Sequence, residues 1–481
     1  PVDHWLVVDH HLSHANLVLH DLYWGTESDK NNFIFTLDGG GNDGYLHAYV
    51  GNKKSGLREL KSWNINLGVA YMRVSGLISE VTGSRVCKEL VPCALGLPGK
   101  LMGYVALGMT RSEWEQPIFD FLTMNGNDHN TNRDPNKGLY YDPSVLPGWK
   151  TFSDEDIENS KGGDGEDIGE KILQERDLSN TLQTVFEKVF MSVIVETISL
   201  AESRGINIES IEGIGLSGGC SLNVLLNSEI QRVFPSWKVH VPAAPGDNGL
   251  AIGAAWMISP PTQKQQQKPQ QLQFIGLPPF DLHLLESLSV QYSAKRVTGV
   301  AEIVTLLSEN KILGVIRGRQ EFGPRALGHR SLLAVPTRGM KDRMNKLKKR
   351  EFFRPVAPMV AAEIAAEFFD EEGISVESPY MSFAPRIRRN FTELVPAVTH
   401  YDRSCRPQTV SEFDEEWVHA LLWGVANKMN TPPVLINTSF NTNGKPIINS
   451  LVEALYLLKT EPELDYVLIE DRLFSKANVM A

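Results

Sequence analysis

Short apolar runs alternate with helical stripes along the first half of the chain. The segments Trp5–Val8, Phe33–Leu37, Ile211–Leu216 and Lys238–Val241 are apolar and bounded by turn residues, so each is predicted to be a strand. Apolar residues recur at helical spacing from Leu178 to Ala201, where Gly205 marks the end of a helix. Further helices are expected over Asp9–Asn16 and Leu250–Met257. Strands alternating with helices predict an α/β fold.

The second half repeats this alternation after a change of composition. Strands are predicted at Ile312–Ile316 and Pro433–Ile436, and helices at Ala361–Phe369 and Trp417–Met429. A Gln- and Pro-rich stretch is typical of an exposed linker, which divides the chain into domains 1–262 and 280–481 joined by a linker over 263–279. The acidic segment Ser153–Glu170 is predicted to be a solvated loop.

Length and charge exclude several classes of protein. A chain of 481 residues is too long for one core, and its net charge of −11 argues against a general nucleic-acid binder. Its four cysteines form no CxxC pair, so neither a zinc ribbon nor a disulfide framework is predicted, and a reducing cytoplasm is expected. No apolar run reaches membrane-spanning length, so no membrane partner is expected.

Three histidines lie within the first predicted helix. His10 and His14 stand four residues apart and share a helix face, a spacing at which two imidazoles can bind one metal ion. His11 and His14, three residues apart, are the alternative pair. Histidines on a helix also occur as structural residues, so the spacing alone leaves both uses open.

Glycine-rich turns follow three of the predicted strands. The first is Asp38-Gly39-Gly40-Gly41-Asn42, the second Ser217-Gly218-Gly219 up to Asn223, and the third Pro245–Gly249 with Asp247. Such turns can bring backbone N–H groups to phosphate oxygens, and a carboxylate at a strand end can hold a metal. Together they suggest one nucleotide site, although the first is equally compatible with a hairpin turn. A further compact turn with a cation is expected at Gly99–Gly103.

Positive charge is concentrated between Gly314 and Pro358. The candidates for phosphate binding are Arg317, Arg325, Lys348, Arg350 and Arg354, because guanidinium groups match phosphate oxygens and a lysine adds a point charge. Glycines and prolines interrupt the run, so it cannot be one solvated helix. Ser439 and Asn441, at the end of a late strand, are predicted to complete the pocket. The alternatives are a basic surface patch or nucleic-acid groove for the arginines, and an ordinary Asx or Ser/Thr turn for the late strand end.

These motifs together resemble the carbamoyltransferase family that includes the nodulation and antibiotic O-carbamoyltransferases. The matching pieces run in order along nearly the whole chain: HHLSHA, LDGGGN, GKLMG, LSGGCSLN, GDNGLAIGAA, GRQEFGPRALGHRS, KKREFFRP, SPYMSF and NTSFN. The resemblance implies an actin/Hsp70-like (ASKHA) ATPase-type domain, similar to the tRNA threonylcarbamoyl transferase, followed by a YrdC-like domain. Relatives carry further residues before HHLSHA, so this chain is expected to lack the first strands of its N-terminal domain.

The resemblance also implies a chemistry. Carbamoyl phosphate and ATP would give carbamoyl adenylate and pyrophosphate in the C-terminal domain, where Lys348, Arg354 and Ser439 match phosphate- and nucleotide-binding positions. The N-terminal domain would pass the carbamoyl group to a hydroxyl of a small-molecule acceptor. There the divalent metal, usually iron in relatives, would be bound by His10, His14, Asp38 and Asp247, and the resemblance thus selects His10 over His11. The expected catalytic residues are His14, Asp38, Lys348 and Arg354.

Two other functions remain open from the sequence. One is a carbamoyl carrier for a protein thiol of the hydrogenase-maturation type, although that class carries an acylphosphatase module and CxxC zinc fingers that are not found here. The other is a non-catalytic nucleotide-binding relative. We expect no nucleic-acid partner, and a homodimer is compatible with the resemblance.

Overall fold

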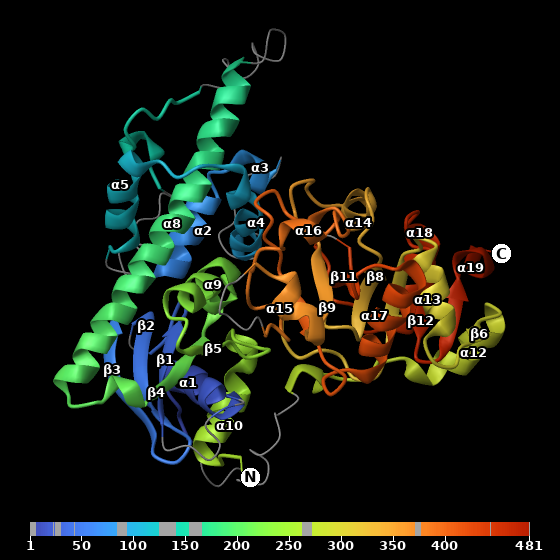
Figure 1. Ribbon diagram of the computed structural model, residues 1–481, viewed down its shortest axis with the longest axis horizontal. Helices are drawn as coiled ribbons and strands as arrows, with labels where there is room; N and C mark the ends of the chain where they lie inside the picture. The colour runs from blue at the N-terminus through green and yellow to red at the C-terminus, as the bar shows by residue number, and fades with distance from the viewer. Residues whose placement is uncertain are drawn as a thin grey trace. The chain divides into compact units, whose positions relative to one another are not determined.

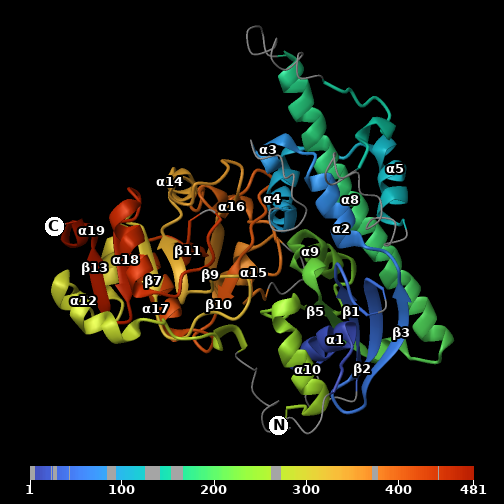
Figure 2. The ribbon, with the colours of Figure 1, turned by 180° about the vertical axis from the view of Figure 1, so that it is seen from behind.

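The computed structural model describes residues 6–22, 24, 30–42, 44–83, 94–124, 141–152, 166–261, 272–370, 377–442 and 444–480. The chain divides into two compact units, Pro1–Pro269 and Gln270–Ala481, each with its own sheet (Figures 1 and 2). Both sheets are mixed and carry helices, which confirms the α/β prediction. The residues 262–271 of the predicted linker lie outside the described residues.

The first unit contains a five-stranded sheet of order β3-β2-β1-β4-β5. Its strands are β1 Asn31–Leu37, β2 Leu46–Asn52, β3 Gly56–Trp63, β4 Ile211–Ser217 and β5 Lys238–His240. Its helices are α1 His10–Asp21, α2 Leu67–Ser75, α3 Ser79–Thr82, α4 Leu97–Tyr104, α5 Ser112–Leu122, α8 Glu166–Ser203, α9 Val224–Val233 and α10 Leu250–Ile258. Strands β1, β4 and β5 are parallel, whereas β2 and β3 form antiparallel hairpins beside them.

The central strand β1 is covered on both faces. Ile34 belongs to a core cluster with Ala15 and Val18 of α1, while the next residue, Phe35, packs edge-on against Phe190 of α8 with ring centroids 5.5 Å apart. Successive strand residues point to opposite faces, so one buried strand contacts both helices. This is why the sequence shows a continuous apolar run rather than an alternating one.

The second unit contains an eight-stranded sheet of order β10-β9-β11-β8-β7-β12-β13-β6. Its strands are β6 Lys295–Arg296, β7 Leu313–Ile316, β8 Arg330–Ala334, β9 Ala357–Ala361, β10 Gln408–Val410, β11 Val434–Ser439, β12 Tyr466–Ile469 and β13 Arg472–Ser475. Its helices are α12 Leu285–Gln291, α13 Ala301–Ser308, α14 Met340–Leu347, α15 Ala365–Phe368, α16 Arg389–Thr392, α17 Glu416–Met429, α18 Leu451–Thr460 and α19 Lys476–Met480. One core cluster joins a sheet face to α13 and α17, and another joins strand residues to α14 and α18.

Several local predictions were wrong. Residues 6–8 form no strand, and Val7 is 94% exposed. The expected turn Gly99–Gly103 lies inside α4, because Pro98 suits the first turn of a helix. The predicted acidic loop Ser153–Glu170 ends too late, because α8 already begins at Glu166. Residues 153–165 lie outside the described residues.

Two boundaries also differ from the predictions. Ala361 ends β9, and the predicted helix after it consists of a 3-10 turn followed by the short helix α15. The described end of the linker, from Leu272 on, packs within the second unit: Gln273 is buried, and Phe274 stacks on His329 with ring centroids 3.8 Å apart. In the described residues, no helix is both long enough and apolar enough to cross a bilayer.

Candidate functional site

The ends of three parallel strands meet at one edge of the first sheet. Asp38 follows β1, Ser217 ends β4, and Asp247 comes after β5. Parallel strands place their carboxyl ends together, where open α/β sheets commonly bind ligands. The three glycine turns lie together at this edge, since Gly218 N donates to the Pro245 carbonyl and Gly219 N donates to Asp38, each at 2.7 Å; the nucleotide site itself stays a prediction. The first turn is also a hairpin connection, because it leads into β2 and Asp38 N donates to Tyr45 O at 3.0 Å.

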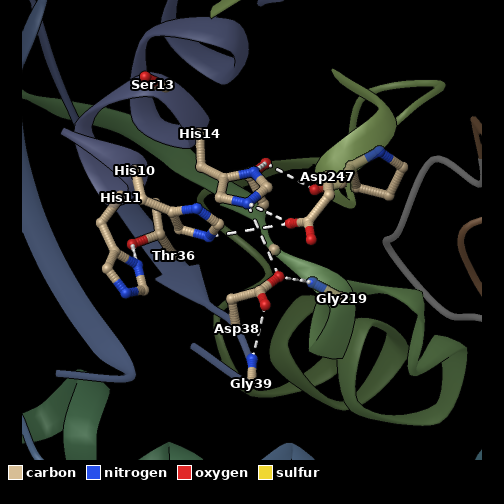
Figure 3. Close-up of polar contacts among 12 residues, drawn as sticks. His10, His11, Ser13, His14, Thr36, Asp38, Gly39, Gly219 and Asp247 are labelled. Atoms are coloured by element: carbon tan, nitrogen blue, oxygen red, sulfur yellow. Dashed lines mark hydrogen bonds and ion pairs between the residues drawn. The ribbon is translucent and has the colours of Figure 1, made fainter. Parts of the chain in front are cut away.

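Helix α1 presents its histidines to this edge in two directions. Asp9 caps the helix by accepting a hydrogen bond from Leu12 N at 2.7 Å. His10 and His14 point toward Asp247, as Figure 3 shows. His11 is buried on another side, where its Nδ1 lies 2.9 Å from Thr36 Oγ1 and its Nε2 lies 3.2 Å from the Gly44 carbonyl.

The four predicted metal ligands come together. One potential ligand atom from each of His10, His14, Asp38 and Asp247 lies within 4.8 Å of the other three. His14 Nε2 is 3.6 Å from Asp38 Oδ2 and 3.4 Å from Asp247 Oδ1, and His10 Nε2 is 3.8 Å from the same Asp247 oxygen. Both Nε2 atoms are buried without a hydrogen-bond partner, which is costly unless a cation occupies the space between the ligands. The donor set therefore fits a divalent metal.

Two contacts orient His14 and Asp38. The Ser217 hydroxyl donates to the Pro245 carbonyl at 2.9 Å, so at 3.1 Å from His14 Nδ1 it can only accept. This places the proton on Nδ1 and leaves the Nε2 lone pair free for a metal. Burial lowers the pKa of His14, which favours the neutral, ligating form. Asp38 accepts from Gly39 N at 2.6 Å and from Gly219 N at 2.7 Å.

Some positions in the glycine turns require glycine for steric reasons, and others do not. A Cβ on Gly41 would lie 2.3 Å from His11 Nε2, and one on Gly218, at φ +90°, would lie 2.1 Å from the Leu37 carbonyl oxygen. Both positions therefore require glycine. A Cβ on Gly40 would meet nothing within 4 Å, so its glycine is not required by packing. Asn42 accepts a hydrogen bond from His10 N at 3.0 Å.

Two residues expected to bind nucleotide have structural partners instead. Ser217 is fully buried against His14 and Pro245, as described above. Asn223 is also buried; its Oδ1 caps α9 through Leu226 N at 3.0 Å, and its amide group is hydrogen-bonded to Gln183. The sequence shows only polar residues in a glycine turn, and it does not show which of them turn inward.

The basic run places four of its five candidates in a second cluster, in the second unit. Lys348 is 5% exposed; its Nζ donates to Ser439 Oγ at 3.1 Å and to Asn441 Oδ1. Arg350 donates to Asn345 Oδ1 at 2.6 Å, and Arg354 lies 3.7 Å from Glu351. We define the cationic cluster as Arg325, Lys348, Arg350, Arg354 and Arg406.

The charges of the cationic cluster perturb one another. Burial, followed by repulsion from Arg354, lowers the pKa of Arg325 to about 10 and that of Arg350 to about 9. The pKa of Lys348 falls well below its usual value through burial and then through Arg350 and Arg354. Lys348 is buried and the four arginines are half-buried. Like charges in such a place suit a polyanion, because an anion would remove both the repulsion and the desolvation cost.

Arg406 belongs to the cationic cluster and was not among the residues predicted to bind phosphate. Burial and then Arg325, Arg350 and Arg354 depress the pKa of Arg406 well below its usual value. Arg406 lies just before β10, far along the chain from the basic run, and no sequence signal distinguished it.

Arg317 was predicted to bind phosphate together with the cationic cluster, but its side chain contacts other residues. Its guanidinium stacks on Trp417, with Cζ 4.1 Å from the ring centroid. The charges that act on it are those of Glu415 and Glu470, not those of the cationic cluster. Arg330, from the same run, is fully buried and donates to the Arg317 and Gly318 carbonyls, which is a structural role.

The fold and the two clusters define an α/β protein with one metal-type site and one polyanion-type site. Residues 2–256 match the family model described as "Carbamoyltransferase N-terminus", and residues 304–476 match "Carbamoyltransferase C-terminus". The chain therefore belongs to the carbamoyltransferase family.

Similar proteins include several nodulation proteins. Nodulation protein NolNO of Sinorhizobium fredii is 34% identical over 63% of this chain and 44% of its own length. Nodulation protein U of Rhizobium tropici is 29% identical over 80% of this chain and 62% of its own length. The uncharacterized protein MJ1051 of Methanocaldococcus jannaschii is 30% identical over 64% of this chain and 60% of its own length. The matched region thus covers between 44% and 62% of the length of these relatives.

Proposed function

We propose that the chain carries out a two-stage O-carbamoyl transfer. The second unit, which we assign to the YrdC-like class, would activate the carbamoyl group with ATP. The first unit, assigned to the ASKHA class, would pass it to an acceptor hydroxyl. The observation that supports this most directly is the presence of two chemically different clusters, because a kinase or a simple hydrolase needs only one site.

In the first stage the cationic cluster binds the phosphates of ATP and carbamoyl phosphate. Water first hydrolyses carbamoyl phosphate to carbamate and inorganic phosphate. A carbamate oxygen then attacks the α-phosphorus of ATP, which forms carbamoyl adenylate and releases pyrophosphate. Lys348 and Arg354 hold phosphate oxygens as negative charge shifts to the departing pyrophosphate. Ser439 and Asn441 hold the Lys348 ammonium in place.

In the second stage the adenylate lies against the glycine turns of the first unit. His10, His14, Asp38 and Asp247 would bind a divalent cation, and a mixed imidazole and carboxylate set suits Fe(II), Mn(II) or Zn(II), with iron our first choice. When bound, the metal supplies Lewis acidity. The acceptor oxygen attacks the carbamoyl carbon, AMP leaves, and the proton of the acceptor hydroxyl passes to water.

The partners we propose are ATP, carbamoyl phosphate and a small molecule with a free hydroxyl. Cys220 and Cys405, the cysteines among the described residues, are both free thiols, which suits a reducing cytoplasm. A homodimer stays a prediction.

The decisive experiment separates the two stages. Arg354→Ala should lose pyrophosphate release by about a hundredfold, which corresponds to about 3 kcal/mol of transition-state stabilisation. It should still transfer carbamoyl from synthetic carbamoyl adenylate. Asp247→Ala should release pyrophosphate but transfer nothing. Arg343→Ala is the matched control, since Arg343 belongs to the same basic run but pairs with Glu463.

If both Arg354→Ala and Asp247→Ala lose both activities while circular dichroism shows intact folds, a single shared site is the better account. If the wild-type chain binds ATP yet releases no pyrophosphate, the non-catalytic alternative is correct.

A further inference from the structure

The loop between β7 and β8 carries Arg325. One buried carboxylate, that of Glu321, accepts hydrogen bonds from the backbone of the residues that follow Arg325. Glu321 Oε1 accepts hydrogen bonds from Leu327 N at 2.7 Å, His329 N at 2.8 Å and Arg330 N at 3.1 Å. Glu321 is only 6% exposed. Hydrogen bonds to a carboxylate are roughly twice as strong as neutral ones, so these three fix the segment from Leu327 to Arg330.

Two amide side chains donate hydrogen bonds to the carbonyl groups of Ala326 and Leu327, the two residues after Arg325. Asn437 of β11 donates to the Ala326 carbonyl at 2.9 Å, and Gln408 of β10 donates to the Leu327 carbonyl at 2.8 Å. Asn437 also donates to Gln408 Oε1 at 2.7 Å, which fixes both amides. Both are buried on strands of the sheet, so the two residues after Arg325 are attached to rigid elements.

Arg325 needs such an anchor because its neighbours repel it. Arg325 is half-buried with its Nε fully buried, and its charge acts against those of Arg354 and Arg406. Before a phosphate arrives, like charges at close range favour any motion of the loop that separates them. In a loop without such hydrogen bonds, Arg325 would move away from the other cations. Each binding event would then cost the free energy of ordering the loop again.

We propose that Glu321 is a positioning residue that holds Arg325 in the cationic cluster for phosphate binding. This inference rests on the proposed function, in which the cationic cluster binds the phosphates. Glu321 acts through the backbone and does not touch substrate. It preorganises the anion site, and the site should bind less tightly without it although every cation is still present.

The test is a double-mutant cycle between Glu321→Gln and Arg325→Ala. Glutamine keeps the size of the side chain and removes its charge. Binding of inorganic pyrophosphate is measured by calorimetry, and the KM for carbamoyl phosphate is measured from pyrophosphate release. We expect Glu321→Gln to weaken pyrophosphate binding and raise the KM about tenfold, which is about 1.4 kcal/mol. In the Arg325→Ala background the same substitution should change both quantities less than twofold.

The matched control is Glu470→Gln. Glu470 also accepts a backbone hydrogen bond from this loop, from Gly318 N at 3.0 Å, but at the end remote in sequence from Arg325. Its effect should be the same with and without Arg325. Should Glu321→Gln fail to fold, Gln408→Met replaces it, because Gln408 holds the Leu327 carbonyl and its loss should couple to Arg325 in the same way.

The outcomes are distinct. Equal effects of Glu321→Gln in both backgrounds mean that Glu321 serves general stability, and the inference is overturned while the proposed function stands. If Arg325→Ala itself leaves pyrophosphate binding unchanged in a folded protein, the assigned role of Arg325 is wrong, and the inference is lost with it. A tenfold loss that disappears in the Arg325→Ala background supports the inference.

Discussion

Removing the Ser217 hydroxyl should weaken metal binding without touching a ligand. Ser217→Ala deletes the group that accepts from His14 Nδ1–H and that donates to the Pro245 carbonyl. The serine is fully buried, so water cannot replace it without rearrangement. His14 then loses the contact that fixes its ring orientation and its proton on Nδ1.

The expected loss of metal affinity follows from the role of hydrogen bonds that orient a metal ligand, here the bond between Ser217 and His14. Loss of a partner that orients a metal-bound histidine typically costs about tenfold to a hundredfold in metal affinity. In Ser217→Ala, the unpaired Nδ1–H of His14 adds about 1–3 kcal/mol of lost stability in the metal-free protein, whereas the Pro245 carbonyl keeps its hydrogen bond from Gly218 N. We therefore expect a weaker metal Kd by at least tenfold and a lower Tm in the presence of a chelator.

The assay is anaerobic titration of the metal-free protein with Fe(II), followed by Mn(II) and Zn(II), together with thermal melts. Ser221→Ala is the control. Ser221 is a buried serine of the same turn, and its hydroxyl donates to the Gly218 carbonyl at 2.6 Å. Its loss should lower the Tm but leave the metal Kd close to that of the wild type.

Two results would contradict this role of Ser217. One is a Ser217→Ala protein that folds and binds metal as tightly as the wild type. The other is an equal loss of affinity in Ser217→Ala and Ser221→Ala, because the effect would then come from the turn and not from His14.

Three further predictions test other parts of the first unit. His14→Ala should purify with far less bound metal than the wild type, as measured by elemental analysis, and equal metal contents would contradict the assignment. Gly41→Ala should lower the Tm and the metal content, since overpacking against the buried His11 costs about 1–3 kcal/mol, whereas Gly40→Ala should change neither. Burial raises the pKa of Glu187 to about 7, so between pH 4.5 and pH 7 the folded state keeps a proton that the unfolded state has released, and the free energy of unfolding should fall as the pH rises through this range. Glu187→Gln should therefore raise the Tm by several degrees at pH 8 and change it little at pH 4. A Tm difference that does not depend on pH would contradict this cause.

The sequence alone was sufficient for the features that depend on neighbouring residues. Helix spacing indicated His10, His11 and His14 as possible ligands, and the family resemblance selected His10 over His11. The positions of Asp38 and Asp247 follow from apolar strands that end in glycine turns. Because parallel strands end at one edge, separate local patterns implied a common site. The strand at Trp5–Val8 was wrong because an apolar composition does not by itself provide a partner strand.

Only the tertiary structure decided which polar groups face the site and which support it. Spacing left His11 open as a ligand, and the structure turns it toward Thr36. Asn223 and Ser217 face inward to other partners, and Arg317 stacks on Trp417 instead of joining the cationic cluster. Arg406 joins that cluster from a distant part of the chain. The direction of a side chain in a turn and the pairing of remote segments depend on contacts across the fold, and these contacts leave no periodic pattern in the local sequence.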